Sequence, residues 1–313
     1  MPVIVSAFGR STLPLKSGSL HDYVLLVILS AIWGASFLFI KIAIVEVTPV
    51  TMAAVRIVIA LGLLYVIARM KGHSLKRPSG REGWIMWGHF LFIGMLGNGL
   101  PFTLVSWGEI EITASLAAIL IGVMPVFTVV FAHAFEVEKL AGPRAGVGIG
   151  AGFAGLILLI GPTVLGELGD AALHQLALIG AAASYAATAV YARRLTLRMP
   201  VLTLATGSMA ASAMVMVPAA LILESPWALR PGLAAIGSVA FLGVFATGFA
   251  SIIYFRLLAS AGPTFASTIN YMIPVFGTGL GMLFLGETVG VWEIAALAMI
   301  LSGITLVKSP VSR

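Results

Sequence analysis

The amino-acid sequence predicts an all-α membrane protein with ten transmembrane helices, arranged as two inverted repeats of five helices. Apolar residues make up 60% of the 313 residues and charged residues only 10%, whereas about a quarter of an ordinary soluble domain is charged. Apolar windows of about 20 residues, the length that crosses a bilayer, recur along the chain. The basic residues gather in alternate connections between these windows. These observations exclude a water-soluble globule, a disordered tail and a fibrous repeat.

Ten windows are long and apolar enough to form membrane-spanning helices. Their apolar runs are continuous rather than alternating, which favours helices over strands, because a helix satisfies its own backbone hydrogen bonds in lipid. The connections are short and hold most of the charged residues, and no segment is long enough for an extramembrane domain. In chain order, the windows are residues 23–45, 49–68, 83–104, 113–135, 142–162, 173–191, 202–223, 233–258, 264–285 and 289–307.

The positions of Lys and Arg predict how the helices are oriented. With ten spans, both termini and the even-numbered connections share one side of the membrane, and fifteen of the 18 basic residues fall there. Lys41 and Arg230 fall on the opposite side, and Arg56 lies inside the second window. By the positive-inside rule, both termini are expected in the cytoplasm, with the chain in the plasma (inner) membrane. The net charge of +6 is therefore a signal of topology, and nucleic acid is not an expected partner.

The chain also repeats itself with an offset of 149 residues. This offset aligns residues 88–138 with 237–287 without a gap, and ten of the 51 positions are identical. Because each repeat has five spans, an odd number, the second copy enters the membrane inverted relative to the first, as in many secondary transporters. The expected segments are a cytoplasmic N-terminal segment at 1–22, repeats at 23–162 and 173–307, and a cytoplasmic C-terminus at 308–313.

Motifs in both halves resemble the drug/metabolite transporter superfamily, and within it the EamA-type permeases. The resemblance covers about residues 22–308. It implies a ten-helix carrier of small metabolites, often amino acids or related solutes, and often directed outward. The motifs that carry it are 33–37 (WGASF), Lys41, Pro49, Arg56, 96–102 (LGNGLPF), 106–109 (SWGE), 115–118 (SLAA), 125–127 (PVF), Glu138, 191–194 (YARR), 254–258 (YFRLL), 261–264 (AGPT), 274–276 (PVF) and 285–287 (LGE).

Arg56 is the foremost candidate for contact with a substrate. It lies about 10 Å inside the outer end of the second window, and a charge at such depth marks a functional site or a buried pair. Its planar guanidinium suits the carboxylate or phosphate of a solute. Two structural alternatives stay open: the side chain snorkels to the outer interface, or it pairs with an acid such as Glu46.

Polar residues in other windows are further candidates for substrate binding. Asn98, Asn270 and Tyr271 are expected to orient a polar solute in a cavity, and Ser36 and Tyr185 are similar candidates in the first and sixth windows. The alternative is that these groups only form interhelical hydrogen bonds, which is the ordinary role of buried polar residues in lipid.

Two matched pairs of residues are candidates for gating. Pro125 and Pro274 occupy equivalent places in the repeats, where proline removes a helical hydrogen bond and bends the axis. They are expected to shape a cavity, or alternatively only the bundle. Glu138 and Glu287 end the fourth and ninth windows. Each is expected to pair with basic residues or cap a helix start, where negative charge is favoured, and a gating ion pair is the other possibility.

Several other chemistries have no support in the sequence. The chain has no cysteine and no P-loop, H-E-x-x-H or G-x-S-x-G motif. The G-x-G-x-x-G pattern at 150–155 lies inside an apolar window, without the strand and helix start that a nucleotide site needs. No acid falls in the middle third of a window, so a carboxylate proton relay is not expected, although His89 and His133 leave proton coupling open. No metal or cofactor is expected.

Taken together, these features predict a secondary transporter that moves a small polar or amphipathic metabolite, such as an amino acid, by alternating access. The resemblance favours export. The expected partners are the solute and membrane lipid, and the sequence does not indicate an oligomeric state. The alternatives are a membrane assembly or sensing protein without transport and, after it, a membrane-embedded enzyme.

Overall fold

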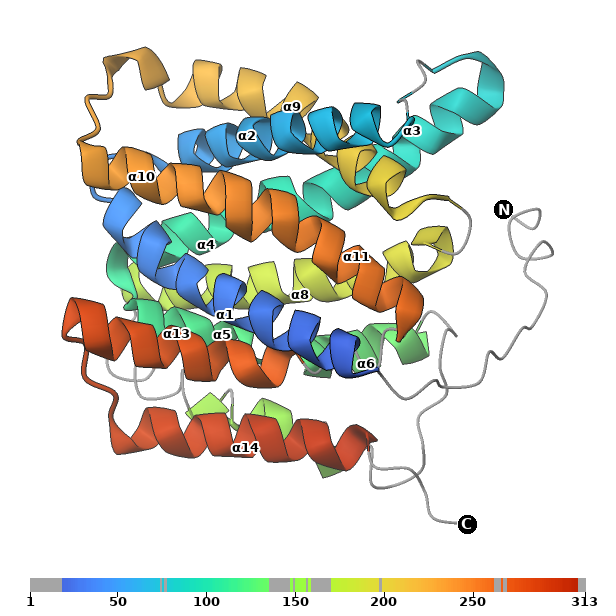
Figure 1. Cartoon of the computed structure of the whole chain (residues 1–313). Coiled ribbons are helices and arrows are strands. Elements are labelled where there is room, and N and C mark those ends of the chain that lie inside the picture. The colour runs from blue at the N-terminus through green and yellow to red at the C-terminus, as the bar shows by residue number, and fades with distance from the viewer. Residues whose placement is uncertain are drawn as a thin grey trace, which may run out of the picture.

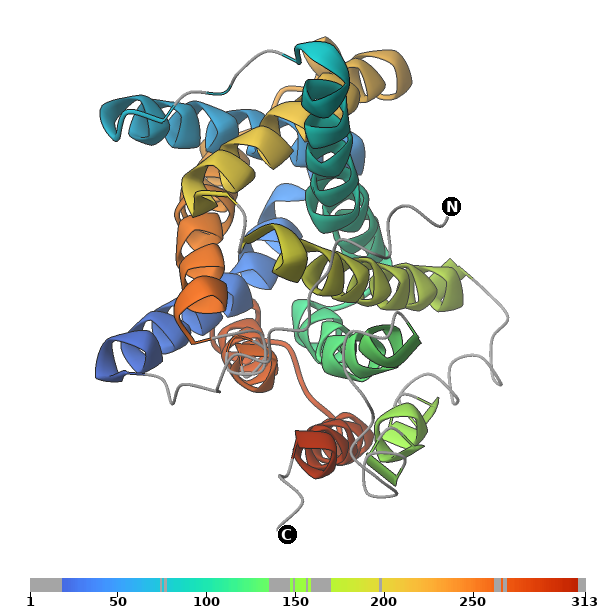
Figure 2. The same ribbon diagram turned by 90° about the vertical axis from the view of Figure 1, so that its right-hand side faces the viewer.

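The computed structural model consists of long helices that run across the view in Figure 1, and Figure 2 shows that several of them cross one another at an angle. The structure describes residues 19–73, 75, 78–134, 147–148, 150–155, 157–158, 170–196, 199–261, 266 and 269–308. Every regular element within these ranges is helical. In chain order they are α1 (Leu20–Ala43), α2 (Pro49–Met70), α3 (Gly80–Gly94), η1 (Met95–Gly99), α4 (Leu100–Glu111), α5 (Ala114–Ile121), α6 (Met124–Ala134), α8 (Asp170–Thr196), α9 (Val201–Leu223), η2 (Pro226–Ala228), α10 (Leu233–Phe241), η3 (Leu242–Phe249), α11 (Ala250–Ser260), α13 (Ile269–Leu285) and α14 (Val291–Lys308).

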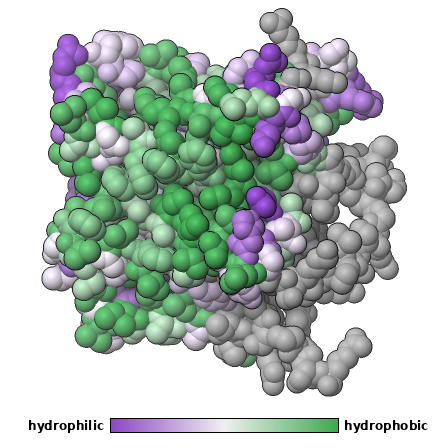
Figure 3. All heavy atoms as spheres, in the orientation of Figure 1, coloured by the Kyte–Doolittle hydropathy of each residue, from purple (hydrophilic) through white to green (hydrophobic). Residues whose placement is uncertain are grey.

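The lengths and compositions of these helices fit a membrane protein with several spans. Within the described ranges, seven helical runs are long and apolar enough to cross a membrane, and two further apolar helices, Ile269–Leu285 and Val291–Ser302, are shorter. Figure 3 shows a face that is mostly hydrophobic, with hydrophilic residues towards the two ends of the helices. The fifth predicted window, residues 142–162, lies largely outside the described residues. The number of ten helices therefore stays a prediction.

The first and last helices share one end of the bundle. α1 begins and α14 ends on the same side, and α2 and α9 lie at the edge of the molecule opposite α14 (Figures 1 and 2). Ser19 starts α1 with a capping box, in which the Asp22 N–H donates to the Ser19 hydroxyl at 3.2 Å and the Ser19 N–H donates to the Asp22 carboxylate at 2.9 Å. An even number of crossings would place both ends of the chain together in this way.

Two predicted windows differ from the helices found. The third, predicted as 83–104, is one helical run from Gly80 to Glu111. Beyond the predicted end, Val105, Ser106 and Glu109 are all buried, so the helix continues to present an inward face. The fourth, predicted as 113–135, is divided into α5 and α6. Proline has no N–H to donate to the preceding turn, so Pro125 helps to end the first of these helices.

Two segments of π-helix interrupt the third and eighth windows. They are η1 (Met95–Gly99) and η3 (Leu242–Phe249). An offset of 149 residues carries 95–99 onto 244–248, which lies inside η3. Because π-helical turns are rare and often occur at functional sites, a site is expected beside these segments.

One π-helical segment packs closely against α2 through two glycines. A Cβ placed on Gly243 would lie 2.7 Å from the Cβ of Ile59, and one on Gly248 would lie 2.7 Å from a methyl carbon of Leu63. Larger residues would therefore force the two helices apart. We call this contact, made by Gly243 and Gly248 with Ile59 and Leu63, the η3–α2 seam.

The other π-helical segment packs in the same manner against α9. A Cβ on Gly94, the residue before η1, would collide with the backbone carbonyl of Ser208, and one on Gly99 would lie 3.1 Å from the Ser212 hydroxyl oxygen. Small residues allow such close helix approaches in membranes. We call this contact, made by Gly94 and Gly99 with Ser208 and Ser212, the η1–α9 seam.

Candidate functional site

Arg56 lies in the interior, where α2, α4 and η3 meet. Only 5% of the residue is exposed. Its Nε donates a hydrogen bond of 2.5 Å to the hydroxyl oxygen of Thr247 in η3. Its guanidinium carbon lies 3.7 Å from the ring centroid of Phe102 in α4, which is a cation–π arrangement. The Thr247 hydroxyl donates in turn to the Leu242 carbonyl at 2.8 Å, so the π-helical segment orients the guanidinium.

The terminal amino groups of Arg56 are left for another partner. Within the described ranges, the two Nη groups form no hydrogen bond. The carboxylate of Glu46, the partner considered from the sequence, instead accepts a hydrogen bond from the Gly232 N–H. Tyr185 on α8 and Glu109 on α4 interact electrostatically with Arg56. A buried guanidinium with free amino groups is suited to bind a carboxylate through two parallel hydrogen bonds.

Glu109 is a buried carboxylate that the sequence places in the 106–109 motif but does not predict as a site residue. Its exposed fraction is 0%, and neither carboxylate oxygen has a hydrogen-bond partner among the described residues. Lys41, Arg56 and Glu287 are the charged groups that act on it. Glu109 follows Phe102 by seven residues on the buried face of α4. That spacing could have revealed it, but the predicted helix ended at residue 104.

Lys41 connects α1 to the last turn of α4. Its Nζ donates to the backbone carbonyl of Glu109 at 2.6 Å and to that of Ile112 at 2.9 Å. The last carbonyls of a helix have no partner within it, and a cation is favourable there. Lys41 therefore stabilises the segment that holds Glu109 in place.

The structure brings Arg56 and Tyr185 together but gives Ser36 a local role. Tyr185 is close enough to Arg56 for electrostatic interaction across α2 and α8. The Ser36 hydroxyl donates to the Ile32 carbonyl of its own helix at 3.1 Å. In this conformation the Ser36 hydroxyl is therefore engaged within α1.

The remaining predicted binding residues lie on two other elements. Asn98 is half-buried within η1, and Asn270 and Tyr271 lie in the first turn of α13, the former buried and the latter half-buried. Next to Asn98, the Ser184 hydroxyl of α8 donates to the Leu96 carbonyl at 2.6 Å, so α8 supports the π-helical turn. A role of these three residues in binding stays a proposal.

Glu287, one of the candidate gating residues, caps the start of α5. Its two carboxylate oxygens accept hydrogen bonds of 2.8 Å from the N–H groups of Ala114 and Ser115. These N–H groups have no partner within the helix, and negative charge is favourable there. The capped helix belongs to the other half of the chain. The matched residue, Glu138, lies outside the described residues.

Pro125 and Pro274 lie in different local structures. Pro125 is the second residue of α6, where the missing N–H costs no hydrogen bond, whereas Pro274 lies inside α13. A Cβ placed on Gly122, at the junction of α5 and α6, would lie 3.0 Å from the Pro274 ring. The helix break and the second proline are therefore in contact.

These features define a polytopic α-helical membrane protein with a buried charged centre. The model of the EamA-like transporter family matches residues 22–161 and, a second time, residues 173–309. The chain belongs to this family, which is part of the drug/metabolite transporter superfamily, and it is a membrane transporter by class.

Similar proteins cover nearly the whole chain. The "Uncharacterized inner membrane transporter YedA" of Escherichia coli K12 is 31% identical over 284 residues, which are 88% of this chain and 87% of YedA. An "Uncharacterized transporter" of Archaeoglobus fulgidus is 24% identical over 92% of this chain and 99% of its own. A crystal structure that covers 93% of this chain and 97% of its own has a TM-score of 0.68 at 18% identity. That likeness supports the fold alone.

Proposed function

We propose that the protein is a secondary transporter that binds a small polar or amphipathic metabolite with a carboxylate, such as an amino acid, at Arg56. It moves this solute outward across the inner membrane by alternating access, with both termini in the cytoplasm. The observation that carries the proposal is the buried guanidinium, which Thr247 and Phe102 orient while its Nη groups form no hydrogen bond with any described residue. Fixing a charge at such depth is costly unless it has a function or a partner. No catalytic reaction is part of this proposal.

Internal symmetry supports the alternating-access mechanism and the inverted repeat. The family model matches the chain twice. The offset of 149 residues that aligns the π-helical segments also carries Ile59 onto Ser208 and Leu63 onto Ser212, and these are the residues that the glycines of the two seams contact. Two repeats that pack through equivalent seams are suited to rock around a site between them.

In this mechanism the other predicted residues act around Arg56. Tyr185 is the second contact for the solute, because it shares the electrostatic surroundings of Arg56. Asn98, Asn270 and Tyr271 line the path of the solute. The contact between Gly122 and Pro274 and the capping of α5 by Glu287 are the places where the halves separate.

The test is uptake by proteoliposomes of labelled amino acids, nucleosides and amines, with and without a pH gradient. We expect saturable flux of a zwitterionic or anionic solute. Arg56→Ala should lower kcat/KM by about 30-fold or more, because losing one partner of a buried charge contact costs about 2–5 kcal/mol. The kcat/KM of Arg56→Lys should lie between those of the wild type and Arg56→Ala, because lysine keeps the positive charge but lacks the planar guanidinium.

The matched control is Arg230→Ala, which removes an exposed arginine bonded only to nearby carbonyls of its own loop in the described structure. Its flux should equal that of the wild type. If no solute shows saturable flux in folded protein, the transporter mechanism is wrong. If Arg56→Ala transports carboxylate solutes normally, Arg56 is structural.

A further inference from the structure

The η3–α2 seam opens into a groove at the end of the bundle where α2 ends. On α2, residues four apart lie on one face. Ile59 and Leu63 are in contact with the glycines of η3. The next two residues of this stripe, Ile67 and Lys71, line the groove instead. α2 therefore diverges from its neighbour in its last two turns.

The neighbouring helix continues the same pattern from the other side. Gly248 packs against α2, and the residues four and eight positions later, Ile252 and Arg256 of α11, line the groove opposite Ile67 and Lys71. The start of α9 closes the groove with Val201 and Leu202. Its volume is about 540 Å³, within the usual range of ligand sites, about 300–1,000 Å³.

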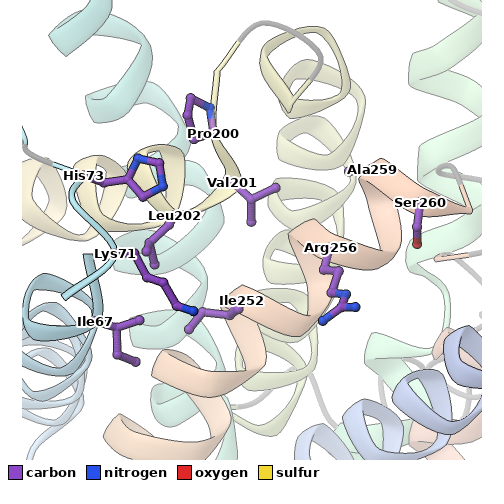
Figure 4. A pocket seen from close by; sticks show the side chains of 10 residues that line it. All are labelled: Ile67, Lys71, His73, Pro200, Val201, Leu202, Ile252, Arg256, Ala259 and Ser260. Atoms are coloured by element: carbon purple, nitrogen blue, oxygen red, sulfur yellow. The ribbon is translucent and has the colours of Figure 1, made fainter. Parts of the chain in front are cut away.

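The lining of the groove is mostly apolar and includes two basic side chains from facing helices. Lys71 and Arg256 enter it from opposite helices (Figure 4). Both are exposed, and within the described part of the chain neither forms a hydrogen bond or ion pair. Ile67 and Ile252 lie one turn deeper, about 6 Å along each helix. Asp22, which contacts the lining residue Ser260, accepts hydrogen bonds from the hydroxyls of Ser19 and Ser260.

We propose that this groove binds one anionic phospholipid, with its phosphate between Lys71 and Arg256 and an acyl chain along Ile67, Ile252 and Leu202. The two cations, which have no partner among the described residues, complement a phosphate, and the apolar walls complement a chain that enters from the bilayer. The basic residues predict that this end is cytoplasmic, and basic pockets between helices on that side recognise anionic headgroups. A zwitterionic headgroup adds its own cation and fits less well. The inference rests on the groove and does not require the proposed substrate.

Native mass spectrometry of the purified protein with phosphatidylglycerol or phosphatidylcholine tests this site. The wild type should retain one phosphatidylglycerol and prefer it over phosphatidylcholine. In Lys71→Gln/Arg256→Gln, affinity for phosphatidylglycerol should fall by about 10- to 30-fold, because each basic contact contributes roughly a factor of five. The matched control is Arg69→Gln/Arg81→Gln, which removes the same charge from exposed residues outside the groove. It should bind as the wild type does.

A second variant tests the apolar part with both cations kept. Leu202→Trp fills the groove and should also abolish lipid retention. Glycerol phosphate, the headgroup without chains, should not displace the lipid at equal concentration. Tryptophan fluorescence melting verifies that each variant is folded. Equal lipid retention in Lys71→Gln/Arg256→Gln and the wild type, or equal losses in that variant and its control, would overturn the proposal. So would displacement by glycerol phosphate or full retention in Leu202→Trp.

Discussion

In both seams a π-helical segment approaches a neighbouring helix through two glycines, Gly94 and Gly99 in the η1–α9 seam and Gly243 and Gly248 in the η3–α2 seam. The spacing of the glycines is the same in both. The difference is what the glycines contact, because Gly94 meets a backbone carbonyl whereas Gly243 meets side-chain atoms of isoleucine. A Cβ on Gly94 would come closer to that carbonyl than a Cβ on Gly243 would come to Ile59, so the η1–α9 seam is the tighter of the two at these aligned positions.

The seams also differ in charge. Arg56 lies beside the η3–α2 seam and bonds to Thr247. In the aligned sequence, Asn98 takes the place of Thr247, and the residue 149 positions after Arg56 is Ala205. Of these aligned positions, only the pair beside the η3–α2 seam includes a charged residue.

The same asymmetry extends to the groove. The residues at an offset of 149 from Lys71 and Arg256 are Ala220 and Trp107. Neither can bind a phosphate through a charge. The two ends of the protein thus present different chemistry on an equivalent framework, as expected if one end faces a leaflet rich in anionic lipid.

The largest effect on stability is expected from filling the tighter seam. Gly94→Ala should lower the free energy of unfolding by about 3 kcal/mol and Gly243→Ala by about 1–2 kcal/mol, because the new Cβ would overlap its neighbour more deeply at Gly94 than at Gly243. Unfolding in mixed detergent micelles, followed by the fluorescence of the six tryptophans, measures both.

The controls for these substitutions are Gly88→Ala and Gly237→Ala. A Cβ at either position would meet nothing within 4 Å. Both should stabilise their helices by about 0.5–1 kcal/mol, the difference in helix propensity between glycine and alanine. Equal costs for Gly94→Ala and Gly243→Ala would show that the seams do not differ in tightness.

The next effect tests the charge of the η3–α2 seam. Thr247→Val keeps the shape of the side chain but leaves the Arg56 Nε without its partner, which should cost about 1–2 kcal/mol. Asn98→Leu at the aligned position should change the free energy of unfolding by less than about 0.5 kcal/mol, because no hydrogen bond of Asn98 is found in the described ranges. The same unfolding measurement tests both variants. A larger loss of stability in Asn98→Leu than in Thr247→Val would contradict the expected difference between the two seams.

A smaller effect is expected where the halves are joined outside the seams. Glu287→Gln keeps one acceptor for the N–H groups of Ala114 and Ser115 but loses the negative charge at the helix start. It should cost about 1 kcal/mol. Glu293→Gln, in the first turn of α14, is the control and should have less effect. An unchanged stability in Glu287→Gln would mean that this cap does not hold the halves together.

The smallest effect on stability is expected at Glu109. Its carboxylate oxygens have no hydrogen-bond donor among the described residues, so replacing it with the neutral, similarly shaped Gln removes a buried charge without removing a bond. We expect Glu109→Gln to melt at the same temperature as the wild type or higher. A clear loss of stability would mean that Glu109 forms a necessary ion pair with Lys41 or Arg56.

The sequence predicted Arg56 as a special position because a charge in an apolar window stands out without any knowledge of packing. It did not predict Glu109, because a charged residue near a window edge usually belongs to a connection. It also could not tell which atoms Lys41 would meet, since those carbonyls lie 68 and 71 residues away along the chain. The sequence around a residue indicated that it was unusual, but it did not indicate which distant residues that side chain contacts.

The sequence by itself determined the class of protein. Composition and apolar length decide whether a chain can reside in lipid, because every buried backbone group there must be satisfied within helices, and the distribution of Lys and Arg predicts the orientation. Only the tertiary structure decided that Arg56 meets Thr247, 191 residues away, and that the seam beside it opens into a groove between Lys71 and Arg256. Those contacts depend on how far two helices diverge. The small residues at the contact determine that divergence, and it cannot be predicted from the sequence of either helix alone.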